Sequence, residues 1–250
     1  MSSSIEVRTL TTPQELFEAG AELVAHLTKE SVEERGRFVV ALSGGSTPRN
    51  LYNLLATNAR NSLPWDRMYF FWGDERHVSP TDKDSNYRMA KEAMLEKVPV
   101  PPANIFRVPA ENSNANLAAE EYEKTMRKFF GLADGQVPVF DLILLGLGPD
   151  GHTASLFPGT AALQEKDKLV VANWVEKFNT HRITFTLPVI NAARCVAFVV
   201  SGMDKASALQ AVLQSDAPGE KYPAKLVHPA NGKLIWLVDR AAASALSGAA

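Results

Sequence analysis

Residues that can carry acid–base chemistry lie directly after an apolar run in the middle of the chain. Residues 142–145 are apolar at consecutive positions, which is typical of a buried parallel strand with helices on both faces. The loop that follows, residues 146–152, contains three glycines, a carboxylate at Asp150 and an imidazole at His152. Open parallel sheets bind ligands beyond the carboxyl ends of their strands, and an imidazole exchanges protons near neutral pH. This loop is therefore the first candidate for catalysis.

A second interpretation of this loop is a dinucleotide-binding turn, because residues 146–151 fit the pattern G-x-G-x-x-G. That fingerprint needs a sustained helix whose N-terminus faces a pyrophosphate. Pro149 interrupts the glycines, Asp150 adds a charge that would repel the pyrophosphate, and Pro158 limits any helix here. We therefore interpret the match as accidental and expect no nicotinamide cofactor.

A possible anion site follows the apolar run at residues 38–42. Its loop reads Ser43, Gly44, Gly45, Ser46, Thr47 and Pro48. We expect Thr47 to cap a helix with Pro48 at its first position, so that free amide groups and the positive end of the helix dipole attract an anion such as a sugar phosphate. No Gly-Lys-Ser/Thr follows, which excludes the nucleotide-triphosphate P-loop. From this loop alone, an ordinary strand-to-helix turn fits the pattern equally well.

A third group of polar residues follows the apolar run at residues 68–72. Asp74, Glu75 and Arg76 come immediately after this predicted strand, so their side chains should face the same crevice as His152. A row of ionisable residues could also form a solvated rim. We favour the functional interpretation because the charges begin where a buried strand ends.

The elements that must position these residues alternate between strand and helix. Strands are predicted at residues 5–10, 38–42, 68–72, 104–108, 142–145, 169–172, 182–187, 195–200 and 234–238. Helices are predicted at residues 13–35, from 48 onward, at 85–97, around 117–130 and around 205–213. We expect Leu117 on the inner side of its helix. The alternation predicts an α/β fold, a three-layer sandwich with a mainly parallel, Rossmann-like central sheet and helices on both faces, in one domain spanning residues 1–250.

Composition limits the classes of partner. The 250 residues include 26 Lys and Arg and 28 Asp and Glu, a formal net charge of −2, with no basic tract for nucleic acid or an anionic membrane. The single cysteine, Cys195, cannot form an intramolecular disulfide, and residues 1–6 lack the features of a signal peptide. No apolar run approaches the ~18 residues that span a bilayer. We therefore expect a cytoplasmic protein with no nucleic acid and no membrane partner.

Four blocks of sequence resemble the 6-phosphogluconolactonase family, within the wider glucosamine-6-phosphate isomerase/lactonase superfamily. The blocks are residues 42–48, 72–76 with 85–87, 146–158, and 182–184 with 201, 202 and 205. The resemblance covers nearly the whole chain and implies a NagB/RpiA-like fold. It also implies hydrolysis of 6-phosphoglucono-δ-lactone to 6-phosphogluconate in the oxidative pentose phosphate pathway, with no obligatory metal or organic cofactor. We expect a monomer.

The resemblance implies a role for each candidate residue. His152 is the base that activates water, and Asp150 orients it or shapes the loop. Arg76 binds substrate or stabilises the oxyanion, and Asp74 holds Arg76 or sugar hydroxyls. The residues implied in binding the phosphate through charge-assisted hydrogen bonds are Ser43, Gly44, Gly45, Ser46, Thr47, Arg182 and Lys205.

Three other interpretations can be distinguished from this one by particular residues. A glucosamine-6-phosphate deaminase-like isomerase of the same superfamily has a carboxylate where this chain has Phe157, and an aromatic residue where it has Arg76. A non-catalytic sugar-phosphate-binding regulator would need no imidazole at His152. A metal site built from His77 and His152 with neighbouring carboxylates lacks the ligand spacing of metal motifs, so we expect no metal.

Overall fold

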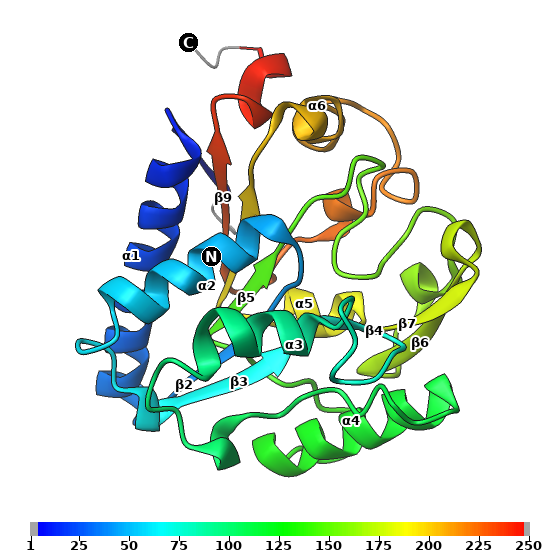
Figure 1. Cartoon of the computed structure of the whole chain (residues 1–250). Coiled ribbons are helices and arrows are strands. Elements are labelled where there is room, and N and C mark those ends of the chain that lie inside the picture. The colour runs from blue at the N-terminus through cyan, green and yellow to red at the C-terminus, as the bar shows by residue number, and fades with distance from the viewer. Residues whose placement is uncertain (1–4, 248–250) are drawn as a thin grey trace.

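The structure, a computed structural model, describes residues 5–247. Its centre is a six-stranded sheet in the order β1-β9-β8-β5-β2-β3, in which every neighbouring pair of strands is parallel (Figure 1). The strands are β1 (Ile5–Leu10), β2 (Phe38–Leu42), β3 (Met68–Trp72), β5 (Leu142–Leu145), β8 (Cys195–Val200) and β9 (Lys233–Asp239). The prediction of a mainly parallel central sheet is confirmed.

Helices surround this sheet (Figure 1). They are α1 (Pro13–Arg35), α2 (Ser46–Asn58), α3 (Asn86–Ala90), α4 (Ala115–Phe130), α5 (Leu187–Asn191) and α6 (Ala206–Gln214). The side chains of β2, β5 and β8 are buried at every position, as parallel strands with both faces covered require. This burial confirms the predicted α/β sandwich. None of the helices in the described part of the chain is long and apolar enough to cross a membrane.

The sequence pattern does not predict the second sheet, which has three antiparallel strands in the order β4-β7-β6. Its strands are β4 (Asp74–Arg76), β6 (Val170–Val175) and β7 (Thr180–Phe185). Only Gly73 separates β3 from β4, so the chain passes directly from one sheet into the other. Three consecutive charged residues carry no apolar alternation, which explains why residues 74–76 resemble a loop in the sequence.

Two local predictions are wrong, and a third is refined. Residues 104–108 form no named strand, and Ile105 makes only an isolated bridge to β3. Leu117 is 47% exposed, whereas Tyr122 and Met126, predicted on the same inner side of α4, are buried. The helix predicted at residues 85–97 consists of α3 followed by a π-helical turn at Lys91–Leu95.

Tyr122 fixes the point where the chain leaves the central sheet. Its hydroxyl accepts a hydrogen bond from the backbone N–H of Trp72 at 2.8 Å and lies 3.2 Å from the carbonyl oxygen of the same residue, to which it donates. Its ring also stacks on Phe185 of β7, with centroids 6.1 Å apart. One buried side chain of α4 therefore contacts both the end of β3 and the second sheet, and so holds the start of β4 in place.

Candidate active site

Four loops lie along one edge of the six-stranded sheet. β8, β5, β2 and β3 are consecutive neighbours and are parallel, so their carboxyl ends lie side by side (Figure 1). The loop after β8 begins at residue 201, the loop after β5 at 146, the loop after β2 at 43 and the loop after β3 at 73. The blocks singled out in the sequence are therefore brought to a common edge, as expected for ligand sites in open parallel sheets.

His152 and Asp150 form a hydrogen-bonded pair in the loop after β5. Nδ1 of His152 lies 2.5 Å from Oδ1 of Asp150. This hydrogen bond holds the pKa of Asp150 well below its usual range, and Lys177, whose Nζ lies 3.4 Å from Oδ2, lowers it further. Because an ionised carboxylate only accepts hydrogen bonds, the neutral imidazole carries its proton on Nδ1 and its lone pair on Nε2. This is the tautomer that a general base needs.

Glycines set the position of this imidazole. A Cβ atom at Gly148 would lie 2.0 Å from Nδ1 of His152, so no side chain fits there. The N–H of Gly148 also donates to the carbonyl oxygen of His152 at 2.9 Å. Gly151 has a φ of 76°, a left-handed conformation that glycine adopts without strain. Two of the three glycines in the loop, Gly148 and Gly151, therefore have a structural reason, whereas a Cβ atom at Gly146 would meet nothing within 4 Å.

Phe157 covers one face of the imidazole. The two rings are stacked, with centroids 4.1 Å apart and planes inclined by 23°. Phe157 is only 6% exposed, so it also shields that face of His152 from water. An apolar ring cannot exchange a proton, and the structure therefore offers no proton relay from this position to His152.

Asp74 is buried at the start of β4 and is tied to the loop that carries His152. The hydroxyl of Ser155 donates to Oδ2 of Asp74 at 2.6 Å, and the side-chain amide of Asn86 donates to the backbone carbonyl of Asp74 at 2.9 Å. Within residues 5–247, no hydrogen bond joins Asp74 to Arg76. Asp74 therefore contacts the loop of His152 rather than Arg76.

Glu75 has a structural role instead of the predicted functional one. It is 2% exposed, and its carboxylate accepts hydrogen bonds from the backbone N–H groups of Asn86 and Tyr87 at the start of α3. The hydroxyl of Ser85 is a further donor. Burial raises the pKa of Glu75, while these hydrogen bonds oppose the shift. The carboxylate therefore caps α3 inside the protein.

Arg76 and Arg182 are direct cross-strand partners in the register of β4 and β7. Burial lowers the pKa of Arg182, and so does the neighbouring positive charge of Arg76. Arg76 donates to the backbone carbonyl of Asp84 at 2.6 Å. Among the described residues, the guanidinium of Arg182 donates no hydrogen bond and forms no ion pair. Two like charges on directly paired residues repel each other unless anions are bound nearby, so each arginine is a candidate for binding an anionic group of a ligand.

The loop after β2 presents the start of α2. This helix begins at Ser46, and Gly45 is its N-cap with a φ of 106°. The predicted cap at Thr47 is therefore wrong, and Pro48 is the third helical residue instead of the first. The left-handed glycine lets the chain turn into the helix earlier than a serine or threonine cap would. The backbone N–H groups of the first turn remain available at the sheet edge.

Two further features of this loop concern its packing and an unpartnered hydroxyl. A Cβ atom at Gly44 would lie 1.8 Å from the side-chain oxygen of Asn86, so only glycine fits. The backbone of Ser43 is hydrogen-bonded to the hydroxyl of Tyr52, but Oγ of Ser43 is buried without a hydrogen-bond partner among the described residues. A buried hydroxyl without a partner is costly, which makes Ser43 a candidate donor to a ligand.

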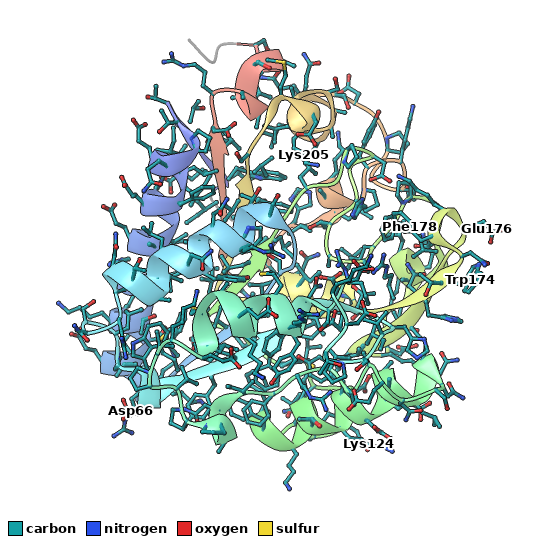
Figure 2. The ribbon with its side chains drawn as sticks, viewed as in Figure 1. Asp66, Lys124, Trp174, Glu176, Phe178 and Lys205 are labelled. Atoms are coloured by element: carbon teal, nitrogen blue, oxygen red, sulfur yellow. The ribbon has the colours of Figure 1, made fainter. Side chains whose placement is uncertain are left out.

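Lys205 and Arg182 approach the site from different sides. Lys205 follows β8. Arg182 lies on β7, which pairs with β4, the strand directly after β3. In the central sheet, β5 and β2 lie between β8 and β3. Figure 2 shows Lys205 beneath α6, away from the end of the β6–β7 hairpin where Phe178 lies. Nζ of Lys205 pairs with Asp204 at 2.8 Å, and the carboxylate of Asp204 is itself largely exposed. The structure does not bring Lys205 and Arg182 into contact.

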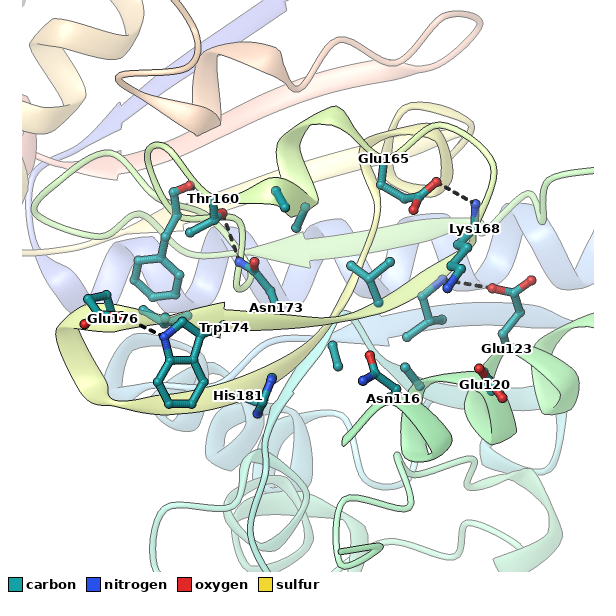
Figure 3. Close-up of a pocket in the computed structure, with 18 of the residues that line it drawn as sticks. Asn116, Glu120, Glu123, Thr160, Glu165, Lys168, Asn173, Trp174, Glu176 and His181 are labelled. Carbon is teal, nitrogen blue, oxygen red and sulfur yellow. Dashed lines mark hydrogen bonds between the residues drawn. The ribbon is translucent and has the colours of Figure 1, made fainter. Parts of the chain in front are cut away.

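A large groove lies beside this site. It has a volume of about 1240 Å³ and runs between α4 and β6. Asn116, Glu120 and Glu123 of α4 face β6 across it, and Trp174 lies at its other end (Figure 3). Of the predicted site residues, only Asp150 reaches its wall. The sequence pattern does not indicate this groove because its walls come from segments far apart in the chain.

Three side chains that contact the site are not among the residues predicted from the sequence. Ser155 follows His152 by three residues within a block that carries the resemblance, so its position was a usable signal. Lys177 and Phe178 lie in a hairpin turn with no motif, and only the fold brings them to Asp150 and Arg182. No local pattern could have found those two.

The fold and the site define an α/β protein with a histidine–carboxylate pair and an arginine pair at the carboxyl edge of a parallel sheet. Among residues 5–247, no group of three or more His, Cys, Asp or Glu side chains is arranged to hold a metal ion. Residues 11–236 match the family model described as glucosamine-6-phosphate isomerases/6-phosphogluconolactonase. The chain belongs to this family.

Similarity to individual relatives extends over nearly the whole chain. A 6-phosphogluconolactonase of Nostoc sp. is 43% identical over 247 residues, which cover 99% of this chain and 100% of the relative. A 6-phosphogluconolactonase of Synechocystis sp. is 44% identical over 237 residues, covering 95% and 96%. The solved structure of 6-phosphogluconolactonase from Trypanosoma brucei is 31% identical and has a TM-score of 0.88, with 98% of this chain and 100% of that chain covered.

Proposed function

We propose that this protein hydrolyses 6-phospho-D-glucono-1,5-lactone to 6-phospho-D-gluconate in the oxidative pentose phosphate pathway. The observation that carries the proposal is the His152–Asp150 pair, with Nε2 free, at a sheet edge that also holds two arginines. Full-length similarity to relatives named 6-phosphogluconolactonase supports it. The reaction makes the protein a carboxylic ester hydrolase and requires no metal or organic cofactor, because an imidazole can activate water.

In the proposed mechanism, Nε2 of His152 takes a proton from water as the water oxygen attacks C1 of the lactone. Negative charge develops on the carbonyl oxygen, and the guanidinium of Arg76 stabilises it. The tetrahedral intermediate then collapses, the bond from C1 to the ring oxygen breaks, and the ring oxygen receives the proton from the imidazolium. Asp150 stabilises the imidazolium between the two proton transfers. The open-chain carboxylic acid that forms then loses its proton to solvent, and the carboxylate is the product.

The phosphate of the substrate binds, in this proposal, at the loop after β2. That loop lies between β3 and β5 in the sheet, so the long side chains of Arg182 and Lys205 can approach it from opposite sides. Residues 44–47 supply backbone N–H groups at the start of α2, and Ser43 supplies a buried hydroxyl. Asp74 contacts sugar hydroxyls in this arrangement.

Gly148→Ala is expected to lower kcat for the lactone about tenfold without unfolding the protein, because the added methyl group must displace the His152 ring from Asp150. Initial rates and the thermal unfolding midpoint measure these two effects separately. Gly146→Ala is the matched control, since a Cβ there meets nothing within 4 Å. Equal losses in both variants would show that the position of His152 does not depend on Gly148.

The purified protein is expected to hydrolyse 6-phosphogluconolactone and to release no ammonia from glucosamine 6-phosphate. The deaminase reaction needs a proton relay, and the position that would supply it is Phe157, which stacks on His152. A cation at Arg76 instead suits the anionic transition state of lactone hydrolysis. Parallel assays of ammonia release and lactone loss test the assignment. Sustained ammonia production, with lactone loss no faster than the spontaneous rate, would reverse it.

The remaining expectations concern the protein as a whole. The protein is proposed to be a monomer, and light scattering at the mass of one chain would test it. A cytoplasmic location agrees with a buried, unpaired Cys195. One domain over residues 1–250 is supported by the shared packing of Tyr122 and Phe185, which joins the two sheets.

A further inference from the structure

A row of ring contacts connects the candidate base to Arg182. Beyond the stacked pair of His152 and Phe157, the ring of Phe157 meets the ring of Phe178 with centroids 5.8 Å apart and planes inclined by 76°. The guanidinium carbon of Arg182 lies 5.3 Å from the centroid of the Phe178 ring. Phe178 therefore lies between the aromatic cover of the base and one of the two clustered arginines.

The hydrophobic core does not account for an aromatic residue at this position. Phe178 is 46% exposed and lies at the end of the β6–β7 hairpin, close to Glu176 (Figure 2). Neither Phe178 nor Phe157 belongs to the main core or to the side chains packed against it. Polar residues are typical of such turns. The two rings form a separate pair, in which Phe157 contacts His152 and Phe178 contacts Lys177 and Arg182.

Arg182 depends on this ring more than an ordinary arginine would. Burial and the charge of Arg76 both disfavour its positive charge, as the lowered pKa of Arg182 indicates. In the described part of the chain, no carboxylate forms an ion pair with its guanidinium. The face of an aromatic ring attracts a cation. The contact with Phe178 therefore offsets part of the repulsion and restricts where the guanidinium can lie.

The same turn is also held to the base pair. Nζ of Lys177 lies 3.4 Å from Oδ2 of Asp150 and 5.5 Å from the centroid of the Phe178 ring. The turn then closes through Asn179 in a left-handed conformation, with a φ of 47°. Adjacent residues of one turn thus contact the carboxylate that orients His152 and the arginine on β7.

We propose that Phe178 is a positioning residue, whose ring holds the guanidinium of Arg182 at a fixed place relative to His152. An anchored phosphate then sets the lactone carbonyl next to the base. The inference rests on the proposed function for the identity of the ligand. It requires that Phe178 affect ligand binding through Arg182 and not through general stability.

A double-mutant cycle tests this requirement, with calorimetric binding of 6-phosphogluconate to the full-length protein as the readout. Phe178→Ala is expected to weaken binding about fivefold, the size of one partly exposed cation–π contact. In the Arg182→Ala background the same change should weaken binding less than about twofold, since no guanidinium is left to hold. Phe178→Tyr keeps the ring and should bind like the wild type.

Trp174→Ala is the matched control, because it removes another exposed aromatic side chain, 43% exposed, from the same hairpin. It should bind 6-phosphogluconate like the wild type. Phe178→Leu keeps apolar bulk without an aromatic face and should behave like Phe178→Ala. Wild-type affinity in Phe178→Ala or Phe178→Leu would overturn the proposal. Equal losses from Phe178→Ala in the two backgrounds would overturn it as well.

Turnover of the lactone, measured separately, distinguishes this inference from the proposed function. The variants could show the coupling between Phe178 and Arg182 in 6-phosphogluconate binding while the wild type fails to hydrolyse the lactone. That result would contradict the proposed function and support the role of Phe178. Hydrolysis without the coupling would do the opposite. A wild type that binds no 6-phosphogluconate at all would overturn both.

Discussion

His152→Ala is expected to lower kcat for 6-phosphogluconolactone by about 10²- to 10⁴-fold, the usual contribution of a general base. The variant loses an imidazole whose Nε2 is set to accept a proton, because Asp150 holds the proton on Nδ1. Folding should be preserved, since His152 lies in a loop and packs on one ring, Phe157. Initial rates with lactone generated in the assay, together with circular dichroism, measure both properties.

The control for this variant is His26→Ala. His26 lies on α1, its side chain is 72% exposed, and its removal should leave kcat unchanged. Binding of 6-phosphogluconate to His152→Ala should survive, because the phosphate contacts are intact. Near-normal turnover by a correctly folded His152→Ala protein would remove this histidine from the mechanism.

Arg182→Ala or Lys205→Ala is expected to lower kcat/KM for the phosphorylated lactone by about 10- to 150-fold, which corresponds to about 1.5 to 3 kcal/mol for one charge-assisted hydrogen bond. Unphosphorylated gluconolactone lacks the group that these cations bind, so its kcat/KM should change much less. Paired kinetics on the two substrates give the ratio directly.

Lys124→Ala provides a matched control for the loss of a positive charge, since Lys124 lies on α4 at the surface, far from Lys205 (Figure 2). Its kcat/KM should remain at the wild-type value on both substrates. Equal losses on the phosphorylated and unphosphorylated lactones would show that Arg182 and Lys205 act on something other than the phosphate. A loss confined to one of the two variants would identify which side of the sheet edge binds the phosphate.

The central sheet and its chemical loops could be predicted because their signals are local. Strands buried on both faces are apolar at consecutive positions, as β2, β5 and β8 are. Parallel neighbours end at a common edge, so His152 and the charged residues after β3 were expected to meet there. That Asp150 orients His152 or shapes the loop was implied by the family resemblance, and in the structure the two side chains are hydrogen-bonded.

Contacts that depend on the register between distant segments could not be predicted. Arg76 and Arg182 become neighbours only because β4 pairs with β7 in a sheet that the sequence pattern does not indicate. Phe178 and Lys177 reach the site through the same hairpin. The helix cap predicted at Thr47 failed because Gly45, with positive φ, starts the helix earlier. In each case a tertiary constraint overrode or supplemented the local preference.

The time course of lactone disappearance tests the proposed hydrolysis most directly. The lactone is generated from glucose 6-phosphate by a dehydrogenase in the same vessel and followed with no added protein, with homogeneous wild type, and with His152→Ala at the same concentration. Catalysis by His152 predicts a rate that rises in proportion to wild-type protein and falls by at least about 10²-fold in the variant. A wild-type rate equal to the spontaneous rate, or an equally fast variant, would contradict it.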